Sequence, residues 1–179
     1  MIGPEQAWAA ILDQVRPLEI VEAPLGKAAG FYLAEAVRAD RDLPPADRSS
    51  VDGYAVRSAD LRGAACLLRV KGEAAAGSGA RPCVRTGTCV RIFTGANVPP
   101  GADRIIKVED AVERDGVVSI SLPAEDARNI LRRGEDARKG AVLVRPGASL
   151  DAMRIGVLAA VGKSRVRVRR RPRVAILCT

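Results

Sequence analysis

Apolar side chains recur at helical spacing near the start of the chain. Pro4 suits the first turn of a helix, and Pro17 ends the pattern. The positions between them form one apolar stripe, made of Ala7, Trp8, Ile11, Leu12 and Val15. This pattern predicts a helix that docks through its Trp8 face. A shorter helix is expected over residues 24–30, and extended chain over residues 31–39.

The middle of the chain has short apolar runs separated by Gly, Pro and Asp. Ser58 can cap a single helical turn, and residues 72–79, rich in Gly and Ala, are typical of a mobile loop. Arg114-Asp115-Gly116 is typical of a hairpin turn. The expected strands are residues 66–70, 88–92, 104–109 and 116–122. Short strands at this spacing predict a compact all-β unit.

After Gly140 the pattern changes again. Residues 141–144 are expected to form a strand, and residues 150–161 a helix that Ser149 caps and Gly162 ends. Residues 164–169 alternate Arg with Val, as a half-solvated strand does. Residues 174–177 (VAIL) are typical of a strand buried on both faces.

These patterns together predict an α+β fold. A β-rich module over residues 46–138 is expected to be inserted into a small α+β unit built from both chain ends, residues 1–45 and 139–172. Residues 173–179 are expected to be the first strand of an α/β domain that the chain does not contain, so that the chain is truncated before that domain.

Composition narrows the possible functions. The chain of 179 residues is 47% hydrophobic, enough for a core, and carries a net charge of +8, which suits anionic ligands. No apolar run approaches the roughly 20 residues of a membrane helix, and no signal peptide is evident. The four cysteines lack C-x-x-C spacing and histidine is absent, which argues against a Cys/His zinc site and a His-based triad. We expect a cytoplasmic protein with reduced thiols.

The first candidate for chemistry is the stretch at residues 44–57, PPADRSSVDGYAVR. The two prolines favour a rigid, extended approach to Asp52-Gly53, a turn dipeptide in which Asp can close an Asx turn and Gly can adopt positive φ. The strand that follows should place Tyr54 and Val56 on one face. A carboxylate would then lie on a tight turn near the hydroxyls of Ser49 and Ser50. The alternative is a hairpin turn whose Asp serves backbone geometry alone.

Two further stretches carry polar groups at turns. In residues 87–103 (GTCVRIFTGANVPPGAD), Thr94-Gly95 follows a strand, where a hydroxyl and freed backbone N–H groups could face an anion. A purely geometric turn is the alternative. In residues 129–136 (NILRRGED), Glu135 and Asp136 lie beside two arginines. They could form a surface salt-bridge cluster, or the arginines could attract phosphate while the carboxylates bind a divalent metal.

All three stretches resemble signatures of the molybdopterin molybdenumtransferases, the MoeA family that includes the gephyrin E-domain. The chain departs from the family pattern at Ala46, Val51, Phe93 and Leu131, where the family usually has Phe, Met, Met and a basic residue. The resemblance implies the N-terminal portion of an enzyme of molybdenum cofactor biosynthesis. Such enzymes hydrolyse adenylylated molybdopterin with a divalent metal such as Mg2+, release AMP, and transfer molybdate to the pterin dithiolate.

The resemblance also implies roles for particular residues. Asp52, Thr94 and Asp136 match catalytic positions of the family. Metal binding is assigned to Asp52, Asp136 and Glu135. Substrate binding is assigned to Ser49, Ser50, Gly95, Arg132 and Arg133. These assignments follow the matched motifs.

The family resemblance further implies partners. Its full-length members are homodimers, with the cleft between this region of one subunit and the pterin-binding domain of the other. A molybdopterin adenylyltransferase is the expected pathway partner, and neither nucleic acid nor membrane is expected to bind. The fragment alone is expected to be inactive.

Two other readings stay open at this stage. A nucleic-acid-binding or ribosome-associated module is suggested by Arg165, Arg167, Arg169, Arg170, Arg171 and Arg173. The alternation of these arginines with valines and the scarcity of aromatic residues, 3% of the chain, weigh against it. The third reading is a scaffold or dimerisation module.

Overall fold

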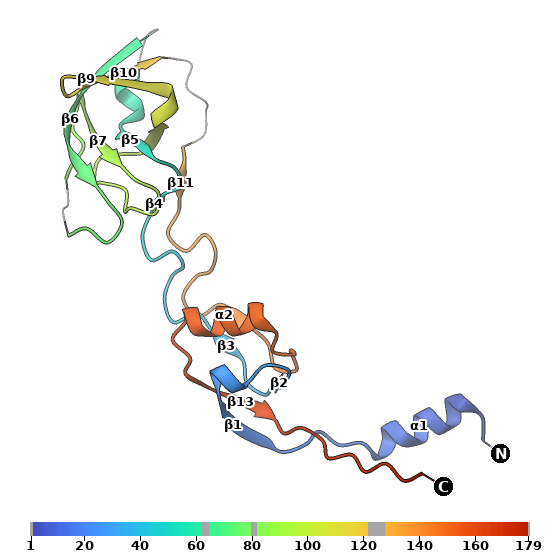
Figure 1. Ribbon diagram of the computed structural model, residues 1–179. Helices are drawn as coiled ribbons and strands as arrows, with labels where there is room; N and C mark the ends of the chain where they lie inside the picture. Colours follow the sequence, from blue (N-terminus) through green and yellow to red (C-terminus); the bar gives the residue numbers. More distant parts are fainter. Residues whose placement is uncertain (1, 62–64, 80–81, 122–127, 179) are drawn as a thin grey trace. The chain divides into compact units, whose positions relative to one another are not determined.

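The computed structural model describes residues 2–61, 65–79, 82–121 and 128–178. Contacts divide the chain into two compact units, one made of Met1–Asp40 with Gly140–Thr179 and the other of Arg41–Lys139 (Figure 1). The fold is of the mixed α+β class. The domain boundaries predicted from the sequence, at residues 46 and 138, stay a prediction. No helix among the described residues is long and apolar enough to cross a bilayer.

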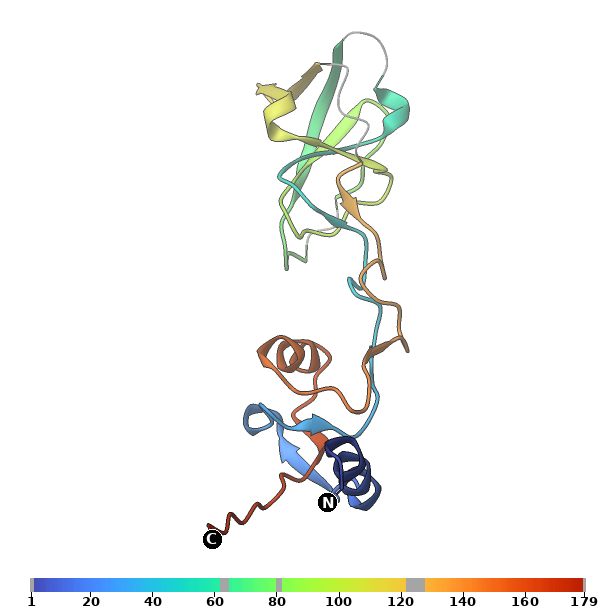
Figure 2. The ribbon, with the colours of Figure 1, turned by 90° about the vertical axis from the view of Figure 1, so that its right-hand side faces the viewer.

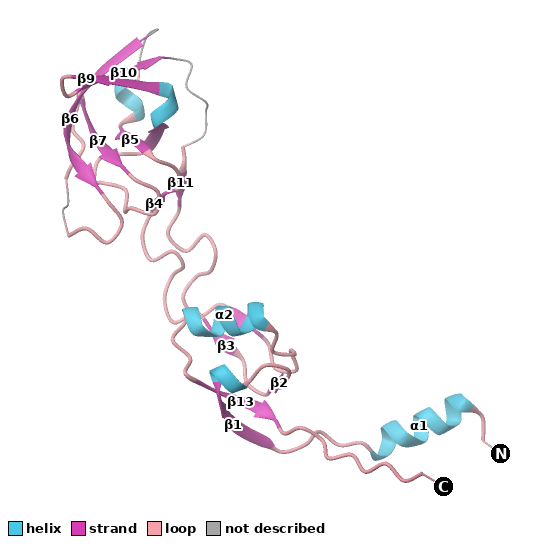
Figure 3. Cartoon of the chain, viewed as in Figure 1, coloured by secondary structure: helices cyan, strands magenta, loops and turns pink. Residues whose placement is uncertain are grey.

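The unit Arg41–Lys139 is built on a six-stranded sheet with the order β8-β5-β7-β6-β10-β9. Neighbours are antiparallel except β6 and β7, which run parallel and lie side by side in Figures 1 and 2. The strands are β5 (Gly53–Val56), β6 (Ala65–Ala74), β7 (Thr88–Ile92), β8 (Arg104–Lys107), β9 (Ala111–Arg114) and β10 (Val117–Ser121). Strands dominate this unit in Figure 3.

Shorter elements complete this unit. Two 3-10 helices, η2 (Ser58–Asp60) and η3 (Val108–Asp110), follow β5 and β8. A separate two-stranded pair joins β4 (Arg48–Ser49) to β11 (Ile130–Leu131).

Strand β5 is buried on both faces, and its side chains alternate between two apolar clusters. Tyr54 and Val56 face the first cluster, with Leu68, Cys89, Val118 and Ile120. Ala55 faces the second, with Val90, Ile92 and Ile105. The prediction that Tyr54 and Val56 share a face is therefore confirmed.

The hairpin predicted at Arg114-Asp115-Gly116 is confirmed. Asp115 and Gly116 have φ of 51° and 73°, the left-handed values that two-residue hairpin turns require. The strand before this turn is β9, which the sequence reading missed. Leu122, expected at the end of the strand after it, lies outside the described residues.

The expected strand over 104–109 stops at Lys107, because Val108–Asp110 form η3. The expected loop over 72–79 begins late, since β6 continues through Ala74.

The other unit contains a three-stranded antiparallel sheet with the order β1-β13-β2, and a pair joining β3 and β12. Its elements are α1 (Pro4–Gln14), β1 (Ile20–Pro24), η1 (Leu25–Lys27), β2 (Tyr32–Leu33), β3 (Val37–Arg38), β12 (Val142–Val144), α2 (Ala152–Ala160) and β13 (Arg165–Arg169). Val166 and Val168 are buried while Arg165 and Arg167 are exposed, which confirms the half-solvated strand. Leu158 of α2 is buried, and α2 contacts η1 and β12.

Helix boundaries differ from the sequence expectations in two places. The cap of α2 is Asp151, not Ser149, because the Asp151 carboxylate accepts a hydrogen bond from Arg154 N at 2.8 Å. The helix expected over 24–30 is only the 3-10 turn η1. Strand β1 runs through Pro24 and leaves no room for a longer helix.

Two apolar segments that were expected to be buried are exposed. Helix α1 has no buried residue, and Trp8 is 63% exposed, so the expected docking through Trp8 is absent among the described residues. Residues 174–177 are exposed as well, and their expected place as the first strand of a following α/β domain stays a prediction. These residues form no strand, and Val174 and Leu177 are 78% and 90% exposed, because no described strand pairs with them.

Candidate functional site

The three polar stretches meet at Ser49. Its backbone N donates to Ala96 O at 2.9 Å, and its carbonyl accepts from Gly95 N at 2.8 Å. On its other side Ser49 pairs with Ile130 of β11. Ser49 is fully buried and its hydroxyl is hydrogen-bonded to Val51 O, so it serves as the central backbone connection among the stretches. Ser50 is exposed, and its N donates to Asn129 O at 3.1 Å.

Asp52 and Thr94 form a direct pair. Oδ1 of Asp52 accepts hydrogen bonds from Thr94 N and from Thr94 Oγ1, each at 2.7 Å. These two bonds, the backbone one first, lower the pKa of the exposed Asp52 carboxyl. Asp52 is therefore ionised at neutral pH. Its second oxygen accepts no hydrogen bond among the described residues and is available to a ligand.

The backbone of the neighbouring strand β8 lies so close to position 53 that only glycine fits there. A Cβ at this position would lie 1.9 Å from Ile106 O, and φ of Gly53 is outside the left-handed region. The expectation of positive φ at Gly53 is therefore wrong. The hairpin reading is wrong as well, since β4 pairs with β11 while β5 lies between β7 and β8. Asp52 is thus held at the beginning of a strand buried on both sides.

The turn after β7 does not present free N–H groups to an anion. Thr94 N donates to Asp52, Gly95 N to Ser49 O, and Ala96 N to Phe93 O at 3.0 Å. The expected anion-binding role of these amides is therefore contradicted. Because the Thr94 hydroxyl donates to Asp52, it offers only its lone pairs to a further partner.

Arg132 and Arg133, the arginines predicted to bind substrate, are held by two acids that the sequence analysis did not identify. Asp47 accepts from Arg132 Nη1 at 2.6 Å and from Arg133 N at 2.8 Å. Asp42 accepts from Arg133 Nε at 2.6 Å and from Lys139 N at 2.9 Å. The pKa values of both carboxyls are lowered, chiefly by the backbone N–H groups. Asp47 lies inside the signature stretch, a signal that could have found it.

Glu135 and Asp136 lie on the same turn but do not contact Asp52. Glu135 Oε2 accepts from Arg132 N at 2.6 Å, and Asp136 N donates to Leu43 O at 3.0 Å. The side chain of Asp136 is exposed. Among the described residues, no group of three or more Asp, Glu, Cys or His side chains is arranged to hold a metal ion. A cation at this site would therefore take further ligands from water or substrate.

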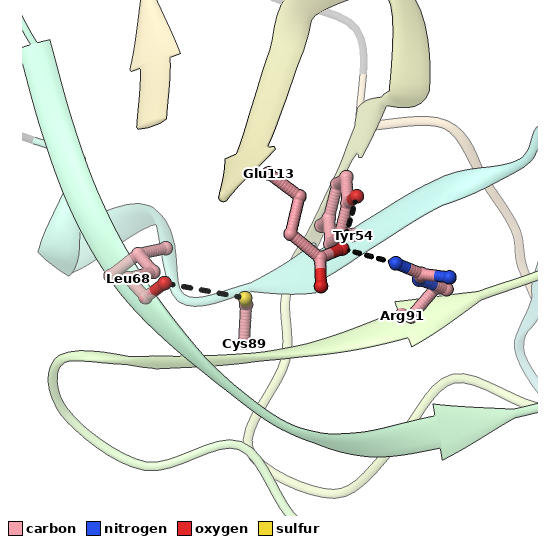
Figure 4. Close-up of polar contacts among 5 residues, drawn as sticks. All are labelled: Tyr54, Leu68, Cys89, Arg91 and Glu113. Atoms are coloured by element: carbon pink, nitrogen blue, oxygen red, sulfur yellow. Dashed lines mark hydrogen bonds and ion pairs between the residues drawn. The ribbon is translucent and has the colours of Figure 1, made fainter. Parts of the chain in front are cut away.

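A partly buried polar cluster joins strands of the six-stranded sheet (Figure 4). Tyr54 Oη donates to Glu113 Oε2 at 2.7 Å, and Arg91 forms an ion pair with the same oxygen. Burial and then this carboxylate raise the pKa of Tyr54, and the Arg91 guanidinium lowers that of Glu113. Burial raises the pKa of the Cys89 thiol to about 12. These groups join β5, β7 and β9, a role in the fold rather than in chemistry.

The fold and the three joined stretches are those expected of the N-terminal region of a MoeA-type protein, and comparison with known families confirms this. The family model for the MoeA N-terminal region (domain I and II) matches residues 2–162. The chain belongs to this family. The resemblance drawn from the three stretches is thereby confirmed.

Curated relatives carry the name molybdopterin molybdenumtransferase. The protein of Staphylococcus aureus strain Mu50 is 32% identical over 179 residues, which cover 98% of this chain and 43% of that protein. The protein of Staphylococcus epidermidis strain RP62A is 31% identical over 182 residues, again covering 43% of its length. The crystal structure of the molybdopterin biosynthesis MoeA protein from Pyrococcus horikoshii OT3 matches with a TM-score of 0.88 and 32% identity. That match covers 94% of this chain and 46% of the archaeal chain. The chain thus spans less than half the length of these relatives.

Proposed function

We propose that this chain is the N-terminal portion of an enzyme that inserts molybdenum from molybdate into adenylylated molybdopterin, in molybdenum cofactor biosynthesis. The observation that carries the proposal is the ionised Asp52, held by Thr94 where the three family stretches join. The curated relatives named for this activity share the whole of this region.

The donor set at Asp52 fits Mg2+ or a similar hard cation. Mg2+ in proteins keeps several waters and is commonly held by one or two carboxylates together with substrate phosphates. Asp52 supplies one such carboxylate oxygen, and the exposed Asp136 and Glu135 are the further candidates. When bound, the ion would neutralise charge on the phosphoanhydride of the substrate.

The chain's own groups have complementary roles in this proposal. Thr94 fixes the Asp52 carboxylate through two donors, so that the second carboxylate oxygen points to metal or water without rearrangement. Gly95 and Ser50, close to this pair along the chain, are the proposed substrate contacts. Arg132 and Arg133 keep N–H donors beyond those used by Asp47 and Asp42, and these can meet an anionic substrate.

The remaining features of the proposal concern the whole enzyme. We propose that residues 46–138 act as a module inserted into the unit formed by the chain ends. A pterin-binding domain, which the family resemblance leads us to expect in the part of the relatives that this chain does not span, would complete the cleft from the other subunit of a homodimer. A molybdopterin adenylyltransferase would supply the substrate, and the reaction would take place in the cytoplasm.

The nucleic-acid reading is less favoured because the arginines of β13 and the segment after it are largely engaged within the protein. Arg165 pairs with Glu22 at 3.1 Å, and Arg170 with Glu19 at 2.6 Å. Arg169 and Arg171 donate to backbone carbonyls, and Arg171 also stacks over Phe31 at 4.5 Å. The two ion pairs neutralise part of the positive charge, and the hydrogen bonds hold Arg169 and Arg171 against the protein, so this segment is less suited to contacting a phosphate backbone.

The test is complementation in trans. The 179-residue chain is mixed with a separately produced pterin-binding half of a relative, and cofactor formation is assayed with Mg2+, molybdate and adenylylated molybdopterin. We expect no turnover from the chain alone and measurable turnover from the mixture, with an Asp52→Asn chain as the matched control. Robust turnover by the chain alone, or none in a mixture of two folded halves, would count against the proposal.

A further inference from the structure

A groove of about 580 Å³ opens beside the Asp52–Thr94 pair, within the unit Arg41–Lys139. Gly77, Ser78 and Gly79 line it from the loop after β6, and Gly95 and Val98 from the segment after β7. Its volume is in the range of small-molecule sites, about 300–1,000 Å³. Gly95 is the residue that follows Thr94, so the groove and the pair are neighbours.

Arg48 is the charged side chain among the described residues that line this groove. Its guanidinium makes no hydrogen bond or ion pair within the described chain, and its Nε is buried without a partner. Burying a cation without a counter-charge is costly. The groove therefore presents an uncompensated positive charge to any molecule that enters it.

The neighbouring acid cannot satisfy Arg48 because it is engaged elsewhere. Both oxygens of Asp47 are already used, one by Arg132 Nη1 and the other by Arg133 N. Across the sheet, Arg91 is paired with Glu113. Arg48 thus differs from Arg91, Arg132 and Arg133, each of which has a carboxylate partner.

We propose that this groove binds a phosphate ester through Arg48. A guanidinium matches the geometry of phosphate oxygens and can bind two of them at once. The remaining walls are small and mostly apolar, with Ala74, Val98 and Pro99 among them, and they suit the organic part of the ester. Binding supplies the counter-charge that Arg48 lacks in the chain.

This subsite complements the site at Asp52. The amides after β7 are used internally, so the anion-binding group near Asp52 is Arg48 rather than the Thr94-Gly95 turn. The identification of the ester as the phosphate end of adenylylated molybdopterin rests on the proposed function. The binding itself does not, because it follows from the groove and its charge.

The experiment measures AMP binding to the 179-residue chain by calorimetry at fixed ionic strength, with adenosine, inorganic phosphate and ribose 5-phosphate as comparison ligands. We expect AMP to bind and adenosine to bind far more weakly. Arg48→Met should weaken AMP binding by about tenfold or more, the size of one lost charge-assisted hydrogen bond. The melting temperature should not fall, because Arg48 has no partner to lose. Stronger binding of AMP than of ribose 5-phosphate identifies a nucleotide ester, and equal binding of the two identifies a sugar phosphate. Inorganic phosphate that binds as tightly as AMP identifies recognition of the phosphate alone.

Two further variants keep the test decisive. Arg114→Met removes an exposed guanidinium from the β9–β10 turn and should leave AMP binding unchanged. Gly79→Asp adds a carboxylate at the groove, where a Cβ meets no atom within 4 Å, and should weaken binding as Arg48→Met does. Equal effects of Arg48→Met and Arg114→Met, or adenosine binding as tightly as AMP, would overturn the proposal. No pterin or metal is present, so a chain that binds AMP but fails in complementation rejects only the proposed function.

Discussion

The hydroxyl and the backbone N–H of Thr94 both donate to the same oxygen of Asp52, each over 2.7 Å. The two residues come from stretches 42 positions apart in the chain. The carboxylate is therefore oriented by the protein before any ligand arrives, and its second oxygen is left toward solvent. Such preorganisation is what a group that positions a metal or a water requires.

This relationship makes Asp52→Asn a clean test of charge in the complementation assay with the pterin-binding half of a relative. The Asn carbonyl oxygen can accept both bonds from Thr94, so the turn is kept while the negative charge is lost. A single positioned catalytic group typically supplies about 10²–10⁴-fold in rate, and activity should fall by that range. Cofactor formation measures the chemistry, and thermal melting checks the fold.

Thr94→Ser is the matched control because it keeps both donors to Asp52. Its turnover should stay within a few-fold of the parent. If Asp52 serves only the backbone geometry, Asn should work nearly as well as Asp, since Asn also closes Asx turns. Near-parental turnover of Asp52→Asn would therefore remove Asp52 from the proposed catalytic residues.

Local features of this fold were predictable from the sequence. Strand β7 has the predicted bounds, Thr88–Ile92, and the β9–β10 turn lies at the predicted Asp115-Gly116. In both cases the information is carried by adjacent residues: an apolar run between turn residues, and a dipeptide that tolerates left-handed φ. The three stretches likewise identified the family.

Long-range pairings were not predictable in this way. The bond between Arg132 and Asp47 joins residues 85 positions apart, and a single sequence does not show such contacts. The role of Gly53 depends on a carbonyl of β8, so the local reading of a turn was plausible but wrong. Side-chain burial at Trp8 and Val174 also depends on neighbours that local periodicity does not identify.

The carboxylates that bind Arg132 and Arg133 should make the stability of the chain depend on pH. Asp42 and Asp47 have pKa values below the usual 3.8 in the folded protein. Such groups stabilise the fold above the unfolded pKa, and this stabilisation is lost as pH falls through the folded value. The free energy of unfolding should therefore decrease below about pH 4.

Urea unfolding at neutral and acidic pH measures this effect. A double variant, Asp42→Asn with Asp47→Asn, should be less stable than the wild type at pH 7 but should lose less stability on acidification. Each Asn keeps an acceptor for the backbone N–H of Lys139 or Arg133. A double variant that keeps the full acid sensitivity would show that these carboxyls are not responsible for it.

The four cysteines should differ in reactivity. Burial raises the pKa of the thiols of Cys66 and Cys89, the latter to about 12, and both side chains are inaccessible. Because the thiolate is the nucleophile, iodoacetamide at about pH 8 should label the exposed Cys83 and Cys178 and leave the buried pair unmodified. Peptide mass spectrometry measures the labelling, and a urea-unfolded sample should show all four sites labelled. Rapid native labelling of Cys89 would contradict the burial of the sheet face.

Adding one methyl group should have opposite effects at two glycines. In Gly53→Ala the new Cβ would meet Ile106 O at 1.9 Å, and the clash involves backbone of an adjacent strand that cannot move without breaking the β5–β8 pairing. Overpacking of this kind costs about 1–3 kcal/mol, and a backbone clash lies at the upper end.

Gly156→Ala lies in the exposed part of α2, where the Cβ meets no atom within 4 Å, and should stabilise by about 0.5–1 kcal/mol. Urea unfolding of both variants gives the two signs, and a neutral Gly53→Ala would refute the close approach that positions Asp52.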